Sequence, residues 1–358
     1  ITKMSLDELQ INYKDFMDKT TALYGASGSG KSAIIVDILY HLRLHIGQII
    51  VFCPTDPVNH TYSGSDSGDD GIVAKPLIHY KLTEDLIIKI WKRQEMLAAV
   101  YSRANQQTVL ESLFAKLQLG NVNKILDRAD AQKAEHISKI EDQYLDKNIQ
   151  KKKIAELEEK HVEFRTLLYK RYIMANISTL SRMNLTTDEA FSLKYIGFNP
   201  RMVVIFDDCS ADFANIKSKD ARNIFEKMFF QNRWVYLTVI LAVHDDKLID
   251  AELRKNAYIS IFTTRQSAYS YVERKTNCFS RDTLKTIVKL SEEVFIQGQH
   301  QKLAYIRQQD KFYRVTATYR KDTPFTFGAD SIRHYCDAIK SSGLSMDRNN
   351  EFYDYFSS

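Results

Sequence analysis

The glycine-rich octapeptide at residues 25–32, which reads GASGSGKS, constrains the fold of this chain more than any other stretch. A short apolar run, TALY at residues 21–24, precedes it, and the helix-like run AIIVDIL follows at residues 33–39. A strand, a glycine-rich turn and a helix start, with the pattern G-x-x-x-x-G-K-S between them, are typical of a phosphate-binding P-loop. The sequence therefore predicts an α/β fold with a nucleotide site at this turn.

Each residue type in the octapeptide suits a bound phosphate. Glycines let the backbone turn tightly, so that successive N–H groups point at an anion at the start of a helix, where the helix dipole also favours negative charge. Lys31 can reach the β- and γ-phosphates, and the hydroxyl of Ser32 can bind Mg²⁺. We therefore expect ATP to be held by Gly25, Ser27, Gly28, Ser29, Gly30, Lys31 and Ser32.

A second motif supplies the carboxylates that nucleotide hydrolysis needs. The apolar run MVVIF at residues 202–206 ends in Asp207 and Asp208. P-loop proteins use a carboxylate at such a strand end to complete the Mg²⁺ shell, so we expect Asp207 to bind the metal together with Ser32. Asp208, one residue further on, points differently and can accept a proton from an attacking water. The two motifs together favour hydrolysis of ATP.

Composition narrows the class of protein. The chain has 358 residues, of which 44% are hydrophobic and 27% charged, as in an ordinary globular protein. No apolar run approaches the ~20 residues that span a bilayer, so we expect no membrane segment. The four cysteines are widely spaced with no C-x-x-C pair, which argues against a zinc site or a disulfide framework. The net charge of +5 permits a polyanionic partner without requiring one.

Further apolar runs predict the rest of a mainly parallel sheet. We expect strands at residues 48–53, 202–206, 234–243 and 258–263, and a hairpin at residues 302–307 and 311–319. We also expect helices at residues 5–15 and 281–295. The segment 261–321 holds twelve Lys or Arg against five Asp or Glu. Aromatic residues are interleaved with these charges, among them Tyr271, Tyr305, Phe312, Tyr313 and Tyr319. Such a segment can follow a nucleic-acid backbone, or it can be a hairpin with core aromatics and solvated charges.

Residues 124–176 form a charged segment with few helix breakers, in which both signs of charge are interleaved. Apolar residues recur there at 3-then-4 spacing in two phases, which predicts two helical stretches with a narrow apolar seam. The stretches form either one bent helix or a hairpin with its tip near Lys147–Lys153. Interleaved charge favours a solvated insertion over a DNA-binding or partner-binding prong. The expected organisation is a first core half, a helical insertion, a second core half and a tail, at residues 1–80, 81–199, 200–321 and 322–358.

Three more polar residues are candidates for the chemistry. His244 ends the predicted strand after the aspartate pair, where it either senses the γ-phosphate through a water or is only a hydrogen-bonded strand-end residue. Arg233, just before that strand, could act as an arginine finger on the phosphate of a neighbouring subunit. Arg254, between this strand and the next, is the competing candidate for that role.

The order of the motifs resembles that of a known family. The chain reads GASGSGKS, then IIVFCPT, VVIFDDC, QNRWVYLTVILAVHD and LRKNAYISIF. Over residues 15–60 and 200–320 this resembles the poxvirus-like genome-packaging ATPases of large eukaryotic DNA viruses, within the FtsK/HerA superfamily. The helical insertion lies outside the resemblance.

The resemblance implies a fold, an activity and partners. It implies an additional-strand P-loop ATPase core that uses ATP and Mg²⁺ and works as a DNA-translocating homo-oligomeric ring. It implies Lys31 and Ser32 at phosphate and metal, Asp207 as metal ligand, Asp208 as catalytic base and Arg233 acting in trans. The family's strand-end sensor is usually Gln, whereas this chain has His244.

The resemblance further implies double-stranded DNA and a viral capsid or portal-like component as partners, in the host cytoplasm at the assembly site or in the virion. Two other functions remain open from the residues alone. One is a nucleotide or nucleoside kinase, and the other is an ATP-binding interaction scaffold without turnover.

Overall fold

The computed structural model describes residues 6–64, 71–213, 215–296, 301–318, 320 and 323–341. Tyr319 and the end of the predicted tail, from residue 342 onward, lie outside the described residues. The chain divides into two compact units, one of residues 1–98 with 199–358 and one of residues 99–198. The first unit contains the sheet, and the second contains only helices and their connections.

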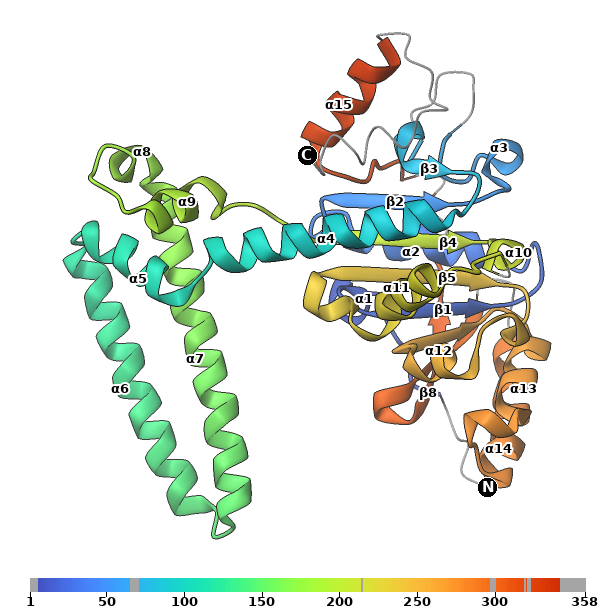
Figure 1. The fold of residues 1–358 in the computed structure, drawn as a ribbon. Coiled ribbons are helices and arrows are strands. Elements are labelled where there is room, and N and C mark those ends of the chain that lie inside the picture. Colours follow the sequence, from blue (N-terminus) through green and yellow to red (C-terminus); the bar gives the residue numbers. More distant parts are fainter. Residues whose placement is uncertain are drawn as a thin grey trace. The chain divides into compact units, whose positions relative to one another are not determined.

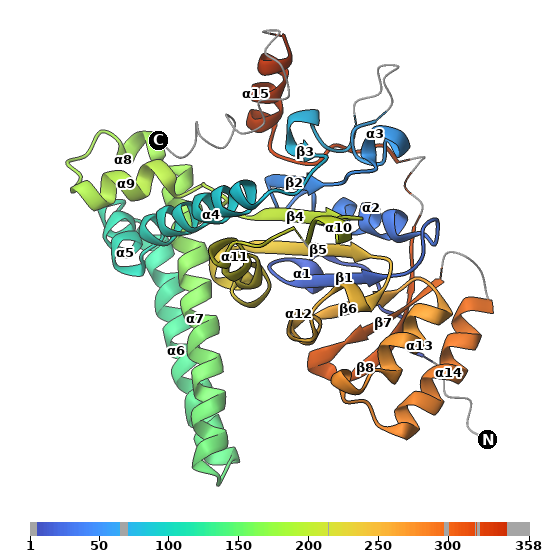
Figure 2. The same cartoon turned by 45° about the vertical axis from the view of Figure 1, so that its right-hand side comes forward.

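The described part of the first unit contains one eight-stranded sheet in the order β3-β2-β4-β5-β1-β6-β7-β8 (Figures 1 and 2). Its strands are β1 (Thr20–Tyr24), β2 (Gln48–Phe52), β3 (Ile78–His79), β4 (Met202–Asp207), β5 (Leu237–Val243), β6 (Ile259–Phe262), β7 (Gln301–Ile306) and β8 (Lys311–Thr316). Every pair from β3 to β6 is parallel, and β7 and β8 are antiparallel additions. The predicted mainly parallel α/β fold is confirmed.

Strand β5 lies between β1, which leads into the P-loop, and β4, which ends in the aspartate pair. Val243 of β5 is in register with Tyr24, and Ala242 is in register with Asp207. Because these three strands are parallel, their carboxyl ends meet at one edge of the sheet, which we call the carboxyl edge. A strand inserted between the P-loop strand and the aspartate strand is the expected additional-strand arrangement.

The core explains why the strands read as continuous apolar runs. All residues of β1, β2, β4 and β5 are buried, as expected of parallel strands covered on both faces. Helix α2 (Lys31–Leu42) packs onto them with one apolar stripe, whose members are fully buried: Ile34, Ile35, Ile38, Leu39 and Leu42. The P-loop is therefore held between a buried strand and a buried helix.

Further helices lie around this core. Those of the first unit are α1 (Tyr13–Phe16), α3 (Asp56–Asn59), α10 (Ser210–Phe213), α11 (Lys219–Phe230), α12 (Ala251–Asn256), α13 (Arg265–Glu273), α14 (Arg281–Ile296) and α15 (Asp330–Ser341). Helix α4 (Glu84–Ala104) runs from the first unit into the second. None of the helices among the described residues is long and apolar enough to cross a membrane.

Two predicted elements were wrong in their bounds. The helix expected at residues 5–15 is only α1, because Glu8 forms a β-bridge with Arg314 and Leu9 N–H donates to the Arg314 carbonyl at 2.8 Å. A backbone paired in this way is extended and cannot be helical. The strand expected from residue 234 begins at Leu237, because Asn232–Val235 forms a 3₁₀ turn, η2, and Tyr236 is left-handed with φ 57°.

The second unit is built around a helical hairpin. Its helices are α5 (Gln107–Lys116), α6 (Gly120–Gln143), α7 (Lys147–Ala175), α8 (Ile177–Leu180) and α9 (Thr187–Tyr195). Helices α6 and α7 pack on each other, so of the two sequence alternatives the structure has the hairpin, with its turn at residues 144–146. Buried residues of α6 and α7 lie only near the base of the hairpin, at Val122, Leu126, Tyr169 and Ile173. Toward the tip, charge pairing replaces the core, as where Arg165 donates to both oxygens of Asp130 at 2.9–3.0 Å.

Candidate nucleotide site at the carboxyl edge

The glycine turn after β1 needs its glycines for two different reasons. Gly28 and Gly30 have φ of +71° and +91°, a left-handed region that favours glycine. At Gly25 the reason is space, because a Cβ there would lie 1.8 Å from the Thr263 Oγ1 atom. Helix α2 begins at Lys31, directly after the turn. The first N–H groups of a buried helix therefore face the loop, as in a P-loop.

Lys31 is folded into this loop. Its side chain is almost fully buried, and its Nζ donates to the carbonyls of Gly25 at 2.7 Å and Ala26 at 3.2 Å. The same Nζ lies 3.9 Å from Asp208 Oδ1. Burial lowers the pKa of Lys31, and the carboxylates of Asp208 and Asp207 oppose that shift. The amine is thus placed between the P-loop backbone and the aspartate pair.

The two aspartates occupy different environments. Asp207 is buried, and its Oδ2 accepts a hydrogen bond from the Tyr62 hydroxyl at 2.9 Å. Burial, with the neighbouring carboxylate of Asp208, raises the pKa of Asp207 to about 6, although Tyr62 and Lys31 oppose the shift. Asp208 is partly exposed and left-handed, with φ 57°, a conformation that turns its side chain away from the strand direction.

His244 and Asp208 meet above the strand ends. His244 Nε2 lies 3.1 Å from Asp208 Oδ1, and the His244 side chain is 44% exposed. That Asp208 oxygen is itself buried and makes no hydrogen bond within the described residues. A buried acceptor between a lysine, a histidine and a P-loop fits a site that takes up water and a phosphorylated ligand.

The magnesium candidates come from separate elements. Ser32 is the second residue of α2 and is half-buried, whereas Asp207 ends β4 at the same edge. Within the described residues, no group of three or more His, Cys, Asp or Glu side chains could hold a metal ion. Mg²⁺ in a nucleotide site keeps several waters and binds one or two protein ligands together with substrate phosphates, so the Ser32 hydroxyl and the Asp207 carboxylate are a suitable ligand pair.

Sequence reasoning missed three residues that hold this site together. Tyr62 fixes Asp207, as described above. Lys302, at the start of β7, donates from its Nζ to the Ser29 carbonyl at 2.8 Å, and burial lowers its pKa. Thr263, just after β6, places its Oγ1 2.5 Å from the Ser29 hydroxyl. No motif spacing signals these contacts, because Ser29 and its two partners lie more than 230 residues apart.

Arg233 lies away from the P-loop of its own chain. It belongs to η2, directly before β5 begins. It lines a hollow with Lys19, Lys255 and Arg307, which flank the opposite ends of β1, β6 and β7; we call this end of the sheet the amino edge. The seven residues of β5 span about 20 Å between the two edges. The structure does not bring Arg233 to Lys31 within one chain.

Arg254, the competing arginine, is buried within its own chain. Its Nη1 donates to the carbonyl of Asp246 at 2.7 Å and also to that of Ile249, and its Nη2 donates to Thr276 Oγ1 at 3.1 Å. A guanidinium engaged in this way stabilises the loop after β5. The geometry argues against a trans-acting role for Arg254.

In the segment at residues 261–321, several aromatic and basic residues have structural contacts. Tyr271 and Tyr305 are buried, and the rings of Tyr305 and Phe312 lie 4.7 Å apart in the core. Arg274 is engaged by both oxygens of Asp246, and Lys302 by the P-loop carbonyl. Of the two sequence alternatives, these contacts favour the hairpin with core aromatics.

The fold and the glycine turn define a P-loop α/β protein with a candidate nucleotide site at the carboxyl edge of its sheet. No family model matches the chain. Its sequence is 34% identical over 369 residues to uncharacterized protein B354L of African swine fever virus (isolate Pig/Kenya/KEN-50/1950), covering 98% of this chain and 96% of that protein. The chain belongs to the B354L family. A shorter match, 34% over 95 residues, reaches uncharacterized protein L437 of Acanthamoeba polyphaga mimivirus, covering 26% of this chain and 30% of that protein.

Solved structures show more distant similarity. The genome packaging NTPase B204 from Sulfolobus turreted icosahedral virus 2, in complex with ATP-gammaS, is 13% identical, covers 83% of this chain and 96% of that chain, and has a TM-score of 0.37. The pCW3 conjugation coupling protein TcpA, in its monomer form with ATPgS, is 12% identical. The match covers 90% of this chain and 66% of that chain and has a TM-score of 0.41. With TM-scores under 0.5, these similarities carry no argument about function.

Proposed function

We propose that this chain is an Mg²⁺-dependent ATP hydrolase. One observation carries the proposal, which is that Asp208 Oδ1 lies 3.9 Å from Lys31 Nζ and 3.1 Å from His244 Nε2 at the mouth of a P-loop. A binding module needs the lysine and the loop but not a second carboxylate beside them. A carboxylate placed between these two groups suits the activation of a water for hydrolysis.

Each side chain has a role in this proposal. The N–H groups at the start of α2 and Lys31 bind the β- and γ-phosphates, and Ser32 with Asp207 would hold Mg²⁺. When bound, the metal neutralises the charge that develops on the phosphate oxygens. Tyr62 orients Asp207 through its hydroxyl. Asp208 accepts the proton of the attacking water, and His244 holds the Asp208 carboxylate in position.

We further propose that hydrolysis drives the translocation of double-stranded DNA during genome packaging, in a homo-oligomeric ring of the poxvirus-like, FtsK/HerA type. The resemblance of the motifs and the viral source of the B354L relatives support this proposal. It places the protein in an infected host cell, at the assembly site or in the virion, with a capsid or portal-like component as a further partner. In such a ring, the distance of Arg233 from its own P-loop suits an arginine finger that serves the neighbouring chain.

The test is the rate of ADP release by the full chain, with and without long duplex DNA, over a salt series. A DNA-stimulated rate that falls as salt rises supports the motor, because phosphate contacts release counterions. The Lys31→Ala chain is the control for contaminating activity. ADP release that requires a small acceptor and ignores DNA would instead identify a kinase, and tight ATP binding without any turnover would identify a scaffold.

A further inference from the structure

A rigid turn at the amino edge presents a tryptophan to solvent. Trp234 is 82% exposed, whereas its neighbours in η2, Asn232 and Val235, are buried. The Asn232 Nδ2 donates to the carbonyls of Asp18 at 3.3 Å and Leu237 at 3.1 Å, and the Val235 carbonyl accepts from Gln94 at 2.6 Å. The turn is thus anchored on both sides of Trp234. A large aromatic side chain held rigidly in water is characteristic of an interaction anchor.

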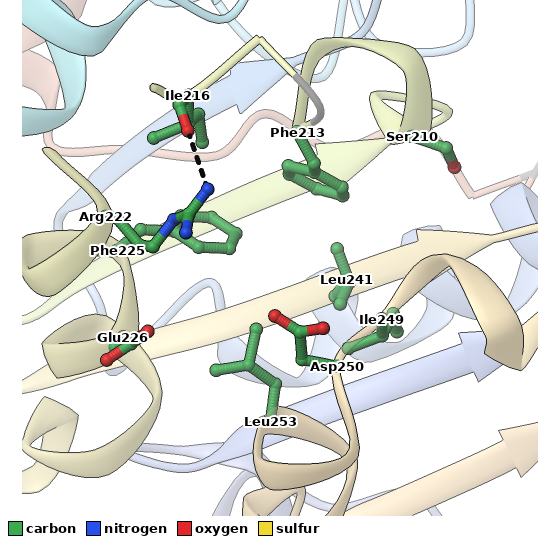
Figure 3. A pocket seen from close by; sticks show the side chains of 10 residues that line it. All are labelled: Ser210, Phe213, Ile216, Arg222, Phe225, Glu226, Leu241, Ile249, Asp250 and Leu253. Carbon is green, nitrogen blue, oxygen red and sulfur yellow. Dashed lines mark hydrogen bonds between the residues drawn. The ribbon is translucent and has the colours of Figure 1, made fainter. Parts of the chain in front are cut away.

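The same unit contains a pocket that is lined by both apolar and polar side chains (Figure 3). Its volume is about 400 Å³, within the range of pockets that hold small ligands, so it can take an indole ring. The apolar side chains that point into it come from α10, α11, β5 and the segment around α12: Phe213, Phe225, Leu241, Ile249 and Leu253. The pocket is therefore a ready site for an aromatic anchor.

The pocket adjoins the candidate catalytic groups. Ser210, which lines the pocket, follows Asp208 by two residues, so their Cα atoms are at most about 7 Å apart. Arg233 directly precedes Trp234, and consecutive Cα atoms are about 3.8 Å apart. If Trp234 of one copy binds in the pocket of a second copy, Arg233 of the first copy therefore lies close to the aspartate pair of the second copy.

Charge also matches between the two surfaces. The hollow that contains Arg233 is lined by three further basic residues and no acidic one: Lys19, Lys255 and Arg307. The pocket carries two carboxylates, Glu226 and Asp250, against one guanidinium, that of Arg222, which donates to the Ile216 carbonyl at 3.4 Å. The basic hollow that contains Arg233, the residue before Trp234, and the net acidic lining of the pocket are complementary in charge.

We propose that Trp234 of one copy of this chain docks into this pocket of the next copy. We call the exposed Trp234 side chain the knob. The knob is not part of the pocket lining, so the contact joins two different surfaces, is heterologous and can close a ring. Docking delivers Arg233 to the neighbouring nucleotide site, and this part rests on the proposed function. The association of the two copies does not depend on the proposed function, because it requires only the exposed tryptophan and the pocket.

The first test follows Trp234 directly. The chain has two tryptophans, and the other, Trp91, is 2% exposed. Acrylamide quenching of the dilute chain should therefore report mainly Trp234. On self-association at high concentration with an ATP analogue, quenching should fall toward that of the Trp234→Phe chain, since the docked indole is shielded. Association with quenching unchanged overturns the proposal.

The second test is complementation. Trp234→Ala removes the knob, and Asp250→Phe fills the pocket from an exposed position whose side chain makes no capping hydrogen bond. By sedimentation velocity, each variant alone should self-associate at least about tenfold more weakly than the unchanged chain. A 1:1 mixture should form a heterodimer, because one chain keeps the pocket and the other keeps the knob.

Controls separate this proposal from the proposed function. Leu44→Ala, at another side chain that is 79% exposed, should associate like the unchanged chain. Lys31→Ala should also associate, because it keeps both the exposed tryptophan and the pocket. If Lys31→Ala and the unchanged chain associate but the unchanged chain does not hydrolyse ATP, only the proposed function is contradicted. Self-association of Trp234→Ala at full strength, or a mixture no better than its components, overturns the docking and leaves the pocket to another ligand. Circular dichroism confirms that each variant is folded.

Discussion

Asp208 and His244 directly follow the neighbouring parallel strands β4 and β5 and place a carboxylate oxygen and an imidazole nitrogen 3.1 Å apart. The pairing of β4 with β5 sets this contact, since Asp207 is in register with Ala242 and Asp208 N–H donates to the Ala242 carbonyl at 3.3 Å. A shift of one residue in that register would turn the side chains of one strand to the other face. The pair is thus a product of sheet register, and it can be tested.

Asp208→Asn should abolish turnover and preserve ATP binding, because the amide cannot accept the proton of water, whereas Lys31 and the P-loop are unchanged. A general base contributes roughly 10²- to 10⁴-fold, so kcat should fall by about that factor. Calorimetric titration of an ATP analogue and ADP release measure the two effects. Asp220→Asn, an exposed acid on α11, is the matched control. Normal turnover in Asp208→Asn would remove Asp208 from the role of base.

His244→Gln should retain most activity and His244→Ala should lose about tenfold in kcat with little change in KM for ATP. The reason is that the imidazole nitrogen lies 3.1 Å from Asp208 Oδ1, where a protonated imidazole holds the carboxylate by charge and a glutamine amide can reach the same oxygen as a donor. Steady-state kinetics of the two variants separates this role from a strand-end residue without function. Equal activity of the alanine variant and the unchanged chain would contradict it.

Lys302→Met should weaken ATP binding by about tenfold without unfolding the chain. The substitution keeps an apolar side chain in the buried position but removes the donor to the Ser29 carbonyl. The P-loop therefore loses one stabilising hydrogen bond. Titration calorimetry measures the affinity, and hydrogen exchange of residues 25–30 reports loosening of the loop. Unchanged exchange and unchanged affinity would show that the contact is dispensable. Lys311→Met, at an exposed lysine on β8, is the control.

Arg233→Ala should lose ATPase activity and recover part of it when mixed with Lys31→Ala. In the mixture, the Lys31→Ala chain supplies an intact Arg233 to the intact P-loop of a neighbouring Arg233→Ala chain. The ATPase rate of the mixture against each variant alone measures the rescue. Arg254→Ala should instead lower the melting temperature, because it leaves the carbonyls of Asp246 and Ile249 without their donor. Absence of rescue would mean that Arg233 acts within its own chain or not at all.

His79 should make the folded state sensitive to acid. It is buried at the end of β3, where burial lowers its pKa to about 4, against about 6.5 when unfolded. Between these values the unfolded chain binds a proton that the folded chain does not, so stability falls as pH falls from 6.5 to 4, by up to about 3 kcal/mol. Urea unfolding at pH 7 and pH 5 should show a smaller loss for His79→Phe than for the unchanged chain. The exposed His136→Gln should behave like the unchanged chain, and an equal loss in all three would exclude His79 as the cause.

Local sequence patterns predicted the main elements well. The runs at residues 21–24, 48–53 and 202–206 are strands because continuous apolar β-rich segments suit burial on both faces of a parallel sheet. The same reasoning failed at Trp234 and Val235, where an apolar pair belongs to a 3₁₀ turn. The bend there is held by the buried Asn232, whose partners on β5 and before β1 are invisible to a local pattern.

The P-loop was determined by sequence alone, since strand, glycine turn and helix start are consecutive and their geometry follows from local backbone preferences. Strand order and register decided the rest. They brought His244 to Asp208, Tyr62 to Asp207 and Lys302 to the glycine loop, and they placed Arg233 at the opposite edge of the sheet. Contacts between residues far apart in the chain depend on which strands pair and where they pair, and the apolar pattern of a single strand does not encode that choice.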